Sequence, residues 1–352
     1  MDLGTAIECV KAAFRAQAAG RTVMPAKITL DLGELGDWPH LGGSYNAMPA
    51  YVDMENLGTF AGVKWISGYE DNVRRGLPFL MSLIILNDPS TGFPLCIMDG
   101  TLITEYRTGA AAAIAAWELA SKGLPRGLTA STADPSVPVS VPVKEQEGLN
   151  ERECFAVTLI GAGAQGKSAL RSMAALGILG DVSVVDIRED RARSLAEYVR
   201  NDLSCNATAS GLDGVEAAVR RTDVIVTATT ANEPLVHAEW TKPGSLVIAL
   251  GSYLEVDERC VTESDAIVVD HEEQVTHRGT LVPYFKSGVL SRDRIRGEIS
   301  RILAGETAGR RSPEERILAV LIGMAIEDIA VAGLVYHNAL KLGVGTRYDL
   351  IS

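Results

Sequence analysis

Hydrophobic residues fall at helical spacing near the start of the chain and in short strand-like runs after it. Ala6, Val10 and Phe14 share one face of a helix expected over residues 3–19. The runs that follow are separated by turn residues, and they predict an antiparallel meander. They cover residues 26–32, 44–52, 60–67, 79–86 and 94–98. A helix rich in alanine is then expected from residue 108 to about residue 121.

The pattern changes twice in the remainder of the chain. Residues 123–152 contain four prolines and several serines, which predicts a loop or hairpin insertion. From residue 155 onwards, short apolar runs alternate with helical stretches. Apolar strands are expected at 155–160, 182–186, 224–228, 246–250 and 266–269, with helices at 165–176 and 191–201. This alternation predicts a parallel sheet with right-handed crossovers, and residues 313–342 complete the chain as one helix or two.

A glycine-rich loop with the sequence GAGAQG follows the first of these strands and opens a helix. The first glycine of such a loop makes the tight turn, the second lets a pyrophosphate approach the backbone, and the third allows the helix to pack on the strand. Free amide groups at the helix N-terminus then favour the pyrophosphate. The candidate cofactor-binding residues of this loop are Gly161, Gly163, Ala164, Gln165 and Gly166.

An acidic residue ends the second strand of the same unit. Asp186 lies 25 residues after Gly161, where a carboxylate binds both ribose hydroxyls of NAD and repels the additional phosphate of NADP. Arg188 lies close by and is compatible with that phosphate. The sequence therefore favours NAD and leaves NADP open.

Length and charge limit what such a protein binds. The 352 residues correspond to about two domains. With 45 acidic and 33 basic residues, the net charge is −12, so neither nucleic acid nor a membrane surface is an expected partner. The N-terminus has no signal-peptide pattern and no apolar stretch is long enough to span a membrane, which predicts a cytoplasmic location. Five scattered cysteines and the histidine spacing predict no metal site.

Several motifs, in order and spacing, resemble the ornithine cyclodeaminase/mu-crystallin family. They begin with GVKW, RGLP, DPSTGFP, MDGT and YRTGAA, and continue with the glycine loop and the late GMAIED. The resemblance implies an α/β fold, with a Rossmann dinucleotide-binding domain at 153–312 inserted in a discontinuous α+β domain. That second domain, residues 1–122 and 313–352, would bind substrate and form a homodimer. The 123–152 insertion would separate the two.

The resemblance also implies a chemistry, since most members move a hydride between a nicotinamide and the α-carbon of a small amino or imino acid. Lys64 lies in an otherwise apolar strand, where a lysine is costly to bury without a partner. By the family match, Lys64 contacts the substrate carboxylate and relays a proton. Arg107 and Lys27 would hold the carboxylate or, for Arg107, the cofactor phosphates, with Met48 as a pocket wall. Thr108, Thr227 and Gly251 complete the expected cofactor-binding set.

One departure from the family pattern separates the function hypotheses. Cyclodeaminases carry an acidic residue where this chain has Tyr253, and tyrosine is a poor base at neutral pH. Glu255 and Asp257 are the nearby acids that would have to substitute. The leading hypothesis is therefore an NAD(P)-dependent imine reductase or amino-acid dehydrogenase. The alternatives are an ornithine cyclodeaminase, which releases ammonia and gives proline, and a non-catalytic crystallin-like binding protein.

Overall fold

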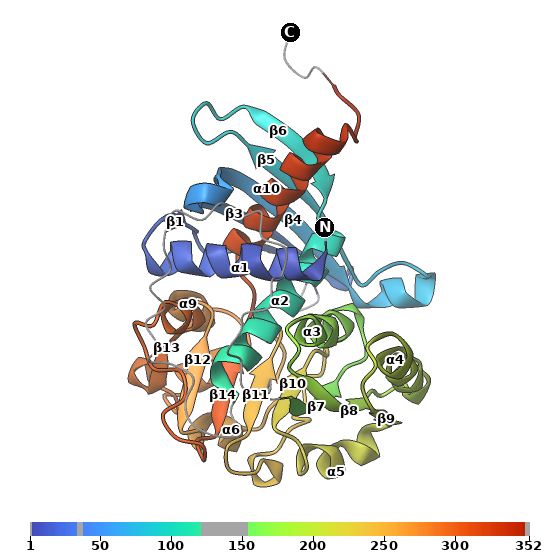
Figure 1. The fold of residues 1–352 in the computed structure, drawn as a ribbon. Coiled ribbons are helices and arrows are strands. Elements are labelled where there is room, and N and C mark those ends of the chain that lie inside the picture. Colours follow the sequence, from blue (N-terminus) through green and yellow to red (C-terminus); the bar gives the residue numbers. More distant parts are fainter. Residues whose placement is uncertain (1, 34–37, 121–153, 349–352) are drawn as a thin grey trace, which may run out of the picture. The chain divides into compact units, whose positions relative to one another are not determined.

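Two sheets organise the chain, one antiparallel and one parallel (Figure 1). The computed structural model describes residues 2–33, 38–120 and 154–348. Its contacts divide the chain into two compact units. The first unit comprises Met1–Thr104 and Ala325–Ser352, and the second comprises Glu105–Met324. In sequence, the second unit is therefore inserted between two parts of the first.

An antiparallel sheet and two helices form the first unit. The strands are β1 (Thr22–Val23), β2 (Ile28–Asp31), β3 (Gly43–Asp53), β4 (Thr59–Tyr69), β5 (Leu80–Asn87) and β6 (Pro94–Asp99). They pair in the order β1-β3-β4-β5-β6, and β2 also pairs with β3. The helices α1 (Leu3–Ala18) and α10 (Ala325–Leu342) pack against each other and against the sheet. The predicted meander is confirmed.

The two faces of this sheet differ in their surroundings. Successive side chains of a strand point to opposite faces. Lys64 and Ile84 are paired across β4 and β5, and both are fully buried on the face that α10 contacts. Their neighbours Trp65 and Leu83 are also paired, but they are exposed on the opposite face. Lys64 therefore lies among apolar side chains on the face of the sheet that α10 covers.

A parallel sheet forms the second unit. The strands are β7 (Phe155–Ile160), β8 (Leu179–Val185), β9 (Ala207–Ser210), β10 (Val224–Thr227), β11 (Leu246–Ala249), β12 (Ala266–Val269), β13 (Ile295–Glu298) and β14 (Ile317–Val320). Their order is β13-β12-β14-β11-β10-β7-β8-β9. The chain leaves β7 for β8 on one side and later returns to β10 on the other. The order therefore reverses between β7 and β10, where ligands bind in sheets of this kind.

Helices of varied length connect these strands. They are α3 (Ala164–Ala175), α4 (Glu189–Asp202), α5 (Val215–Val219), α6 (Glu258–Thr262), α7 (Glu272–Val275), α8 (Val282–Lys286) and α9 (Ile299–Leu303). The 3-10 helices are η1 (Glu55–Leu57), η2 (Glu70–Arg75), η3 (Leu212–Gly214), η4 (Ala238–Trp240) and η5 (Arg292–Arg294). Strands β7, β10, β11, β12 and β14 supply much of the buried core. The predicted α/β class with an inserted Rossmann unit is confirmed.

Two expected elements were placed wrongly by the sequence pattern. Helix α2 (Thr101–Leu119) begins at Thr101 and not at residue 108. Asp99 accepts the Thr101 amide at 3.1 Å and caps the first turn, which allows the earlier start. Residues 313–342 are not continuously helical, since β14 precedes α10. A short apolar run buried on both faces has no period that separates strand from helix.

The remaining differences concern weak patterns and boundaries. Strands β9 and β13 have few apolar residues and were not expected. Residues 105–122 and 313–324, assigned by the sequence to the substrate domain, fall within the range of the second unit. The expected 123–152 insertion lies outside the described residues. None of the described helices has the length and apolarity that crossing a membrane requires.

Candidate functional site

The glycine loop after β7 has the backbone that a dinucleotide requires. Gly161 has φ +104°, and a side chain there would lie 2.5 Å from the carbonyl oxygen of Ala228. Gly166 packs so closely on the Gly161 carbonyl that a side chain would collide with it. Gly163, by contrast, faces open space and begins α3 without a capping side chain. The loop therefore leaves the amide groups of the α3 N-terminus accessible to an anion.

Asp186 ties this loop to the end of β8. Its carboxylate accepts the amide of Ala162 at 2.8 Å and the amide of Arg188 at 2.8 Å, and the residue is 9% exposed. The guanidinium of Arg188 pairs with Asp190 at 2.8 Å, and this hydrogen bond lowers the pKa of the Asp190 carboxyl. The acid expected at the ribose position is thus in place beside the glycine loop, and Arg188 is held by another carboxylate.

A second carboxylate braces the loop that follows β10. Glu255 is fully buried, and it accepts the Thr229 amide at 2.6 Å, the Thr229 hydroxyl at 2.7 Å and the Thr227 hydroxyl at 3.0 Å. Burial raises the pKa of Glu255 to about 7, against the lowering effect of these hydrogen bonds. Gly251 lies beside it, since a side chain there would come 3.9 Å from the carboxylate. Two of the expected cofactor-binding residues, Thr227 and Gly251, therefore lie next to the Glu255 carboxylate.

Arg107 and Thr108 lie on α2, within the range of the second unit. Both are nearly buried, at 7% and 9% exposed. The Arg107 guanidinium reaches Gly323, which follows β14, has φ +79° and leaves no space for a side chain. The Gly323 amide donates to Asp270 at 2.6 Å. The Arg107 guanidinium therefore lies against the backbone that follows β14.

A buried ion pair lies in the first unit. The ammonium of Lys64 is 2.7 Å from the carboxylate of Asp328 on α10, and neither side chain is exposed. Lys64 also donates to the Thr104 hydroxyl at 3.3 Å, and Thr104 in turn donates to the carbonyl of Gly100 at 2.8 Å. A charged lysine is tolerated in an apolar interior because a carboxylate and a hydroxyl accept its hydrogen bonds.

The sequence prediction missed the partner of Lys64. A signal was present, since Glu327 and Asp328 interrupt an otherwise apolar helix and both are fully buried. Met48 is the cross-strand partner of Lys64. Lys27 precedes β2, whose first residue Ile28 pairs with β3 one position from Met48. The register thus brings Lys27, Met48 and Lys64 to neighbouring positions of one sheet.

The acids suggested as substitutes for a cyclodeaminase carboxylate have other contacts. Asp257 accepts the Cys260 amide at 2.7 Å, which caps α6, and lies 3.2 Å from the His237 ring. Glu255 is committed to the threonines after β10. Tyr253 accepts the Thr280 hydroxyl through its carbonyl at 2.8 Å. Both carboxylates are therefore engaged by neighbouring groups of the protein.

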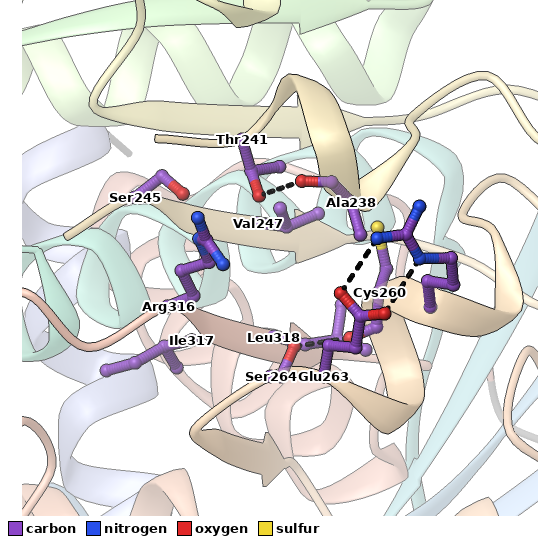
Figure 2. A pocket seen from close by; sticks show the side chains of 11 residues that line it. Ala238, Thr241, Ser245, Val247, Cys260, Glu263, Ser264, Arg316, Ile317 and Leu318 are labelled. Atoms are coloured by element: carbon purple, nitrogen blue, oxygen red, sulfur yellow. Dashed lines mark hydrogen bonds and ion pairs between the residues drawn. The ribbon is translucent and has the colours of Figure 1, made fainter. Parts of the chain in front are cut away.

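Figure 2 shows a separate narrow pocket in the second unit. It is lined by residues at the amino ends of β11 and β14, including Ser245 and Arg316. The crevice between β7 and β10 lies at the carboxyl ends of the strands, so this pocket is not the dinucleotide site. Among residues 2–33, 38–120 and 154–348, no group of three histidine, cysteine or acidic side chains is placed to hold a metal ion.

Comparisons with known proteins agree with this arrangement. The sequence model of the ornithine cyclodeaminase/mu-crystallin family matches residues 1–125 and 148–343 of this chain. Alanine dehydrogenase of Archaeoglobus fulgidus is 33% identical over 353 residues, covering 99% of this chain and 94% of that protein.

Two solved structures extend the comparison. One is Thermococcus litoralis Δ1-pyrroline-2-carboxylate reductase in complex with NADH and L-proline. It has a TM-score of 0.82, 29% identity, and coverage of 99% and 96% of the two chains. The other is an archaeal alanine dehydrogenase dimer with bound NAD. It also has a TM-score of 0.82, with 32% identity and coverage of 100% and 96%.

Proposed function

This chain belongs to the ornithine cyclodeaminase/mu-crystallin family, and we propose that it is an NAD-dependent oxidoreductase acting on the C–N bond of a small amino or imino acid. One observation carries the proposal: the glycine loop ends at an open helix N-terminus, with Asp186 bonded to its backbone. The dehydrogenase and reductase among its relatives support the same reaction class.

The second unit carries the residues that fit the cofactor. The amides of Gly163, Ala164 and Gln165 would hold the pyrophosphate, and Asp186 would hold the ribose hydroxyls. The two glycines at 161 and 166 keep the loop close enough to its neighbours to form that cradle. When bound, NAD supplies or accepts the hydride.

The remaining residues are assigned to the substrate or, for Arg107, to the cofactor. We assign proton transfer to the imine or amine nitrogen to Lys64 Nζ, because Asp328 keeps an ammonium at this buried position. In the first unit, Lys27 and Lys64 are the cations assigned to the substrate carboxylate. In the second unit, Arg107 is assigned to the cofactor phosphates, because a planar guanidinium suits a phosphate through paired hydrogen bonds. Met48 is assigned to the pocket wall beside Lys64.

The two alternative functions receive less support. An ornithine cyclodeaminase needs an acid at the position of Tyr253, and the nearby Glu255 and Asp257 are engaged elsewhere. A binding protein without catalysis has no need for a fully buried lysine–carboxylate pair, which is expensive to desolvate.

We also propose a homodimer. The face of the antiparallel sheet opposite α10 exposes apolar side chains in adjacent rows, with Leu83 opposite Trp65 and Ile85 opposite Ile97. Exposed apolar surface on paired strands is typical of an interface. One relative is a dimer in its solved structure. Light scattering of the purified protein should give twice the chain mass, and a monomer at micromolar concentration would contradict this assignment.

A substrate panel tests the reaction class. The purified protein is incubated with NADH and cyclic imines, or with α-keto acids and ammonia, and in the reverse direction with NAD and L-amino acids. Net consumption or production of NADH, followed by absorbance, supports the oxidoreductase. Conversion of L-ornithine to proline and ammonia without net change in NADH would identify the lyase instead.

A further inference from the structure

The strand order leaves one side of the crevice for the nicotinamide half of the cofactor. This inference rests on the proposed function. Asp186 at the end of β8 takes the ribose of the adenosine half, and the glycine loop after β7 takes the pyrophosphate. The dinucleotide extends across the switch point, so its other half falls to the side of β10 and β11. The loop after β10 and Gly251 after β11 form that side.

Glu255 is the side chain that holds these segments together. Its Oε1 accepts both the amide and the hydroxyl of Thr229, while its Oε2 accepts the hydroxyl of Thr227. The Thr229 hydroxyl also accepts the amide of Ala231 at 3.1 Å. The braced loop abuts the first glycine of the phosphate loop, since a side chain at Gly161 would lie 2.9 Å from a Thr229 methyl group.

These contacts make the two oxygens of Glu255 unequal as sites for a proton. Oε1 accepts two hydrogen bonds, from the amide and the hydroxyl of Thr229, whereas Oε2 accepts one, from the Thr227 hydroxyl. The proton of neutral Glu255 is therefore assigned to Oε2, which requires the Thr227 hydroxyl to turn from donor to acceptor. Protonation changes both the charge and a hydrogen-bond direction at the end of β10.

The surroundings of Glu255 set the pH at which this happens. Burial raises the pKa of its carboxyl to about 7. The titratable neighbours on its own segment are Tyr253 and Asp257. The amides of residues 235–236 donate to the backbone carbonyl of Glu255. The next residue, His237, is the titratable group of this segment, and its ring lies 3.2 Å from Asp257. The contacts from β10 are neutral threonines.

We propose that Glu255 is a positioning residue of the nicotinamide half of the cofactor site, whose negative charge favours NAD⁺ over NADH. The oxidised nicotinamide ring carries a positive charge that the reduced ring lacks, and a buried carboxylate is weakly screened. Ionisation of Glu255 therefore strengthens NAD⁺ binding relative to NADH binding, and it favours the oxidative direction at higher pH.

Cofactor affinities test the proposal without reference to turnover. The dissociation constants of NAD⁺ and NADH are measured by calorimetry from about pH 6 to about pH 8 for the wild type, Glu255→Gln and Thr227→Val. In the wild type, the NADH/NAD⁺ ratio of dissociation constants should rise about three- to tenfold over this range. Glu255→Gln keeps the shape without the charge, so its ratio should stay flat. Thr227→Val removes a donor to the carboxylate and should move the transition to higher pH.

Glu258→Gln is the matched control, because it makes the same change at an exposed position three residues along the chain and should follow the wild type. A ratio that rises equally in Glu255→Gln overturns the proposal. A flat ratio in the wild type overturns it as well. A wild-type protein that binds neither form of the cofactor overturns the proposed function itself, and that outcome is distinct from the other two.

Discussion

The buried pair of Lys64 and Asp328 predicts a large loss of stability when one charge is removed. In Asp328→Asn, the ammonium of Lys64 keeps its place in an interior with no exposed surface but loses the carboxylate at 2.7 Å. Breaking a buried pair in this way costs about 3–5 kcal/mol, because a charge is left without compensation. The Thr104 hydroxyl at 3.3 Å remains as an acceptor, which places the expected loss near the lower end of that range.

Native-state hydrogen exchange in increasing denaturant measures this loss where it occurs. Peptides from β4 and α10 report the free energy of opening of the first unit, so unfolding of the second unit does not confuse the result. The double variant Lys64→Met with Asp328→Leu should recover most of the loss, since apolar replacements of a buried pair are often neutral or stabilising.

Glu8→Gln is the control, because Glu8 forms an exposed pair with Lys11 at 2.8 Å in the same unit. It should cost less than about 1 kcal/mol. An Asp328→Asn variant that loses no more than this control would refute the argument that the pair is buried and mutually dependent.

Three further predictions concern the sites. Lys64→Ala should abolish NADH-dependent turnover in a steady-state assay while NADH still binds by fluorescence, and unchanged turnover would remove Lys64 from catalysis. Asp186→Ser should shift the NAD/NADP ratio of kcat/KM at least about tenfold toward NADP, since the repelling carboxylate is gone. The raised pKa of Glu255 means that the native state keeps this proton between about pH 4.5 and pH 7. The resulting stabilisation is complete below that interval and lost above it. Relative to Glu255→Gln, the free energy of unfolding of the wild type should therefore fall by about 3 kcal/mol as the pH rises from 4.5 to 7 in urea titrations.

The sequence predicted the elements whose patterns are local. The spacing of the glycines in the loop predicts the strand before it and the helix after it, because the backbone of this turn requires glycine at those positions. The run that forms β14 was read as helix because it is buried on both faces and has no polar period. Its strand identity comes from β11 and β12, its neighbours in the sheet, which only the tertiary structure brings together.

The candidate site shows the same division. Lys64 was identifiable because a lysine in an apolar strand demands a partner, but the partner lies on the last helix. Glu255 was noted as an acid near a family position, and its role as a brace for Thr227 and Thr229 depends on contacts between separate strand ends. The sequence identified the ionisable residues, and only the fold shows the partners that stabilise them in the interior.

Transfer of deuterium from NADH labelled at C4 of the nicotinamide tests the central claim most directly. The label is followed by mass spectrometry of the amino acid formed from an imine or keto acid that the substrate panel identifies. The proposed function predicts one deuterium on the α-carbon of the product for each NADH consumed, when the transferred position is labelled. Products without deuterium from either stereospecifically labelled form of NADH would contradict hydride transfer to that carbon.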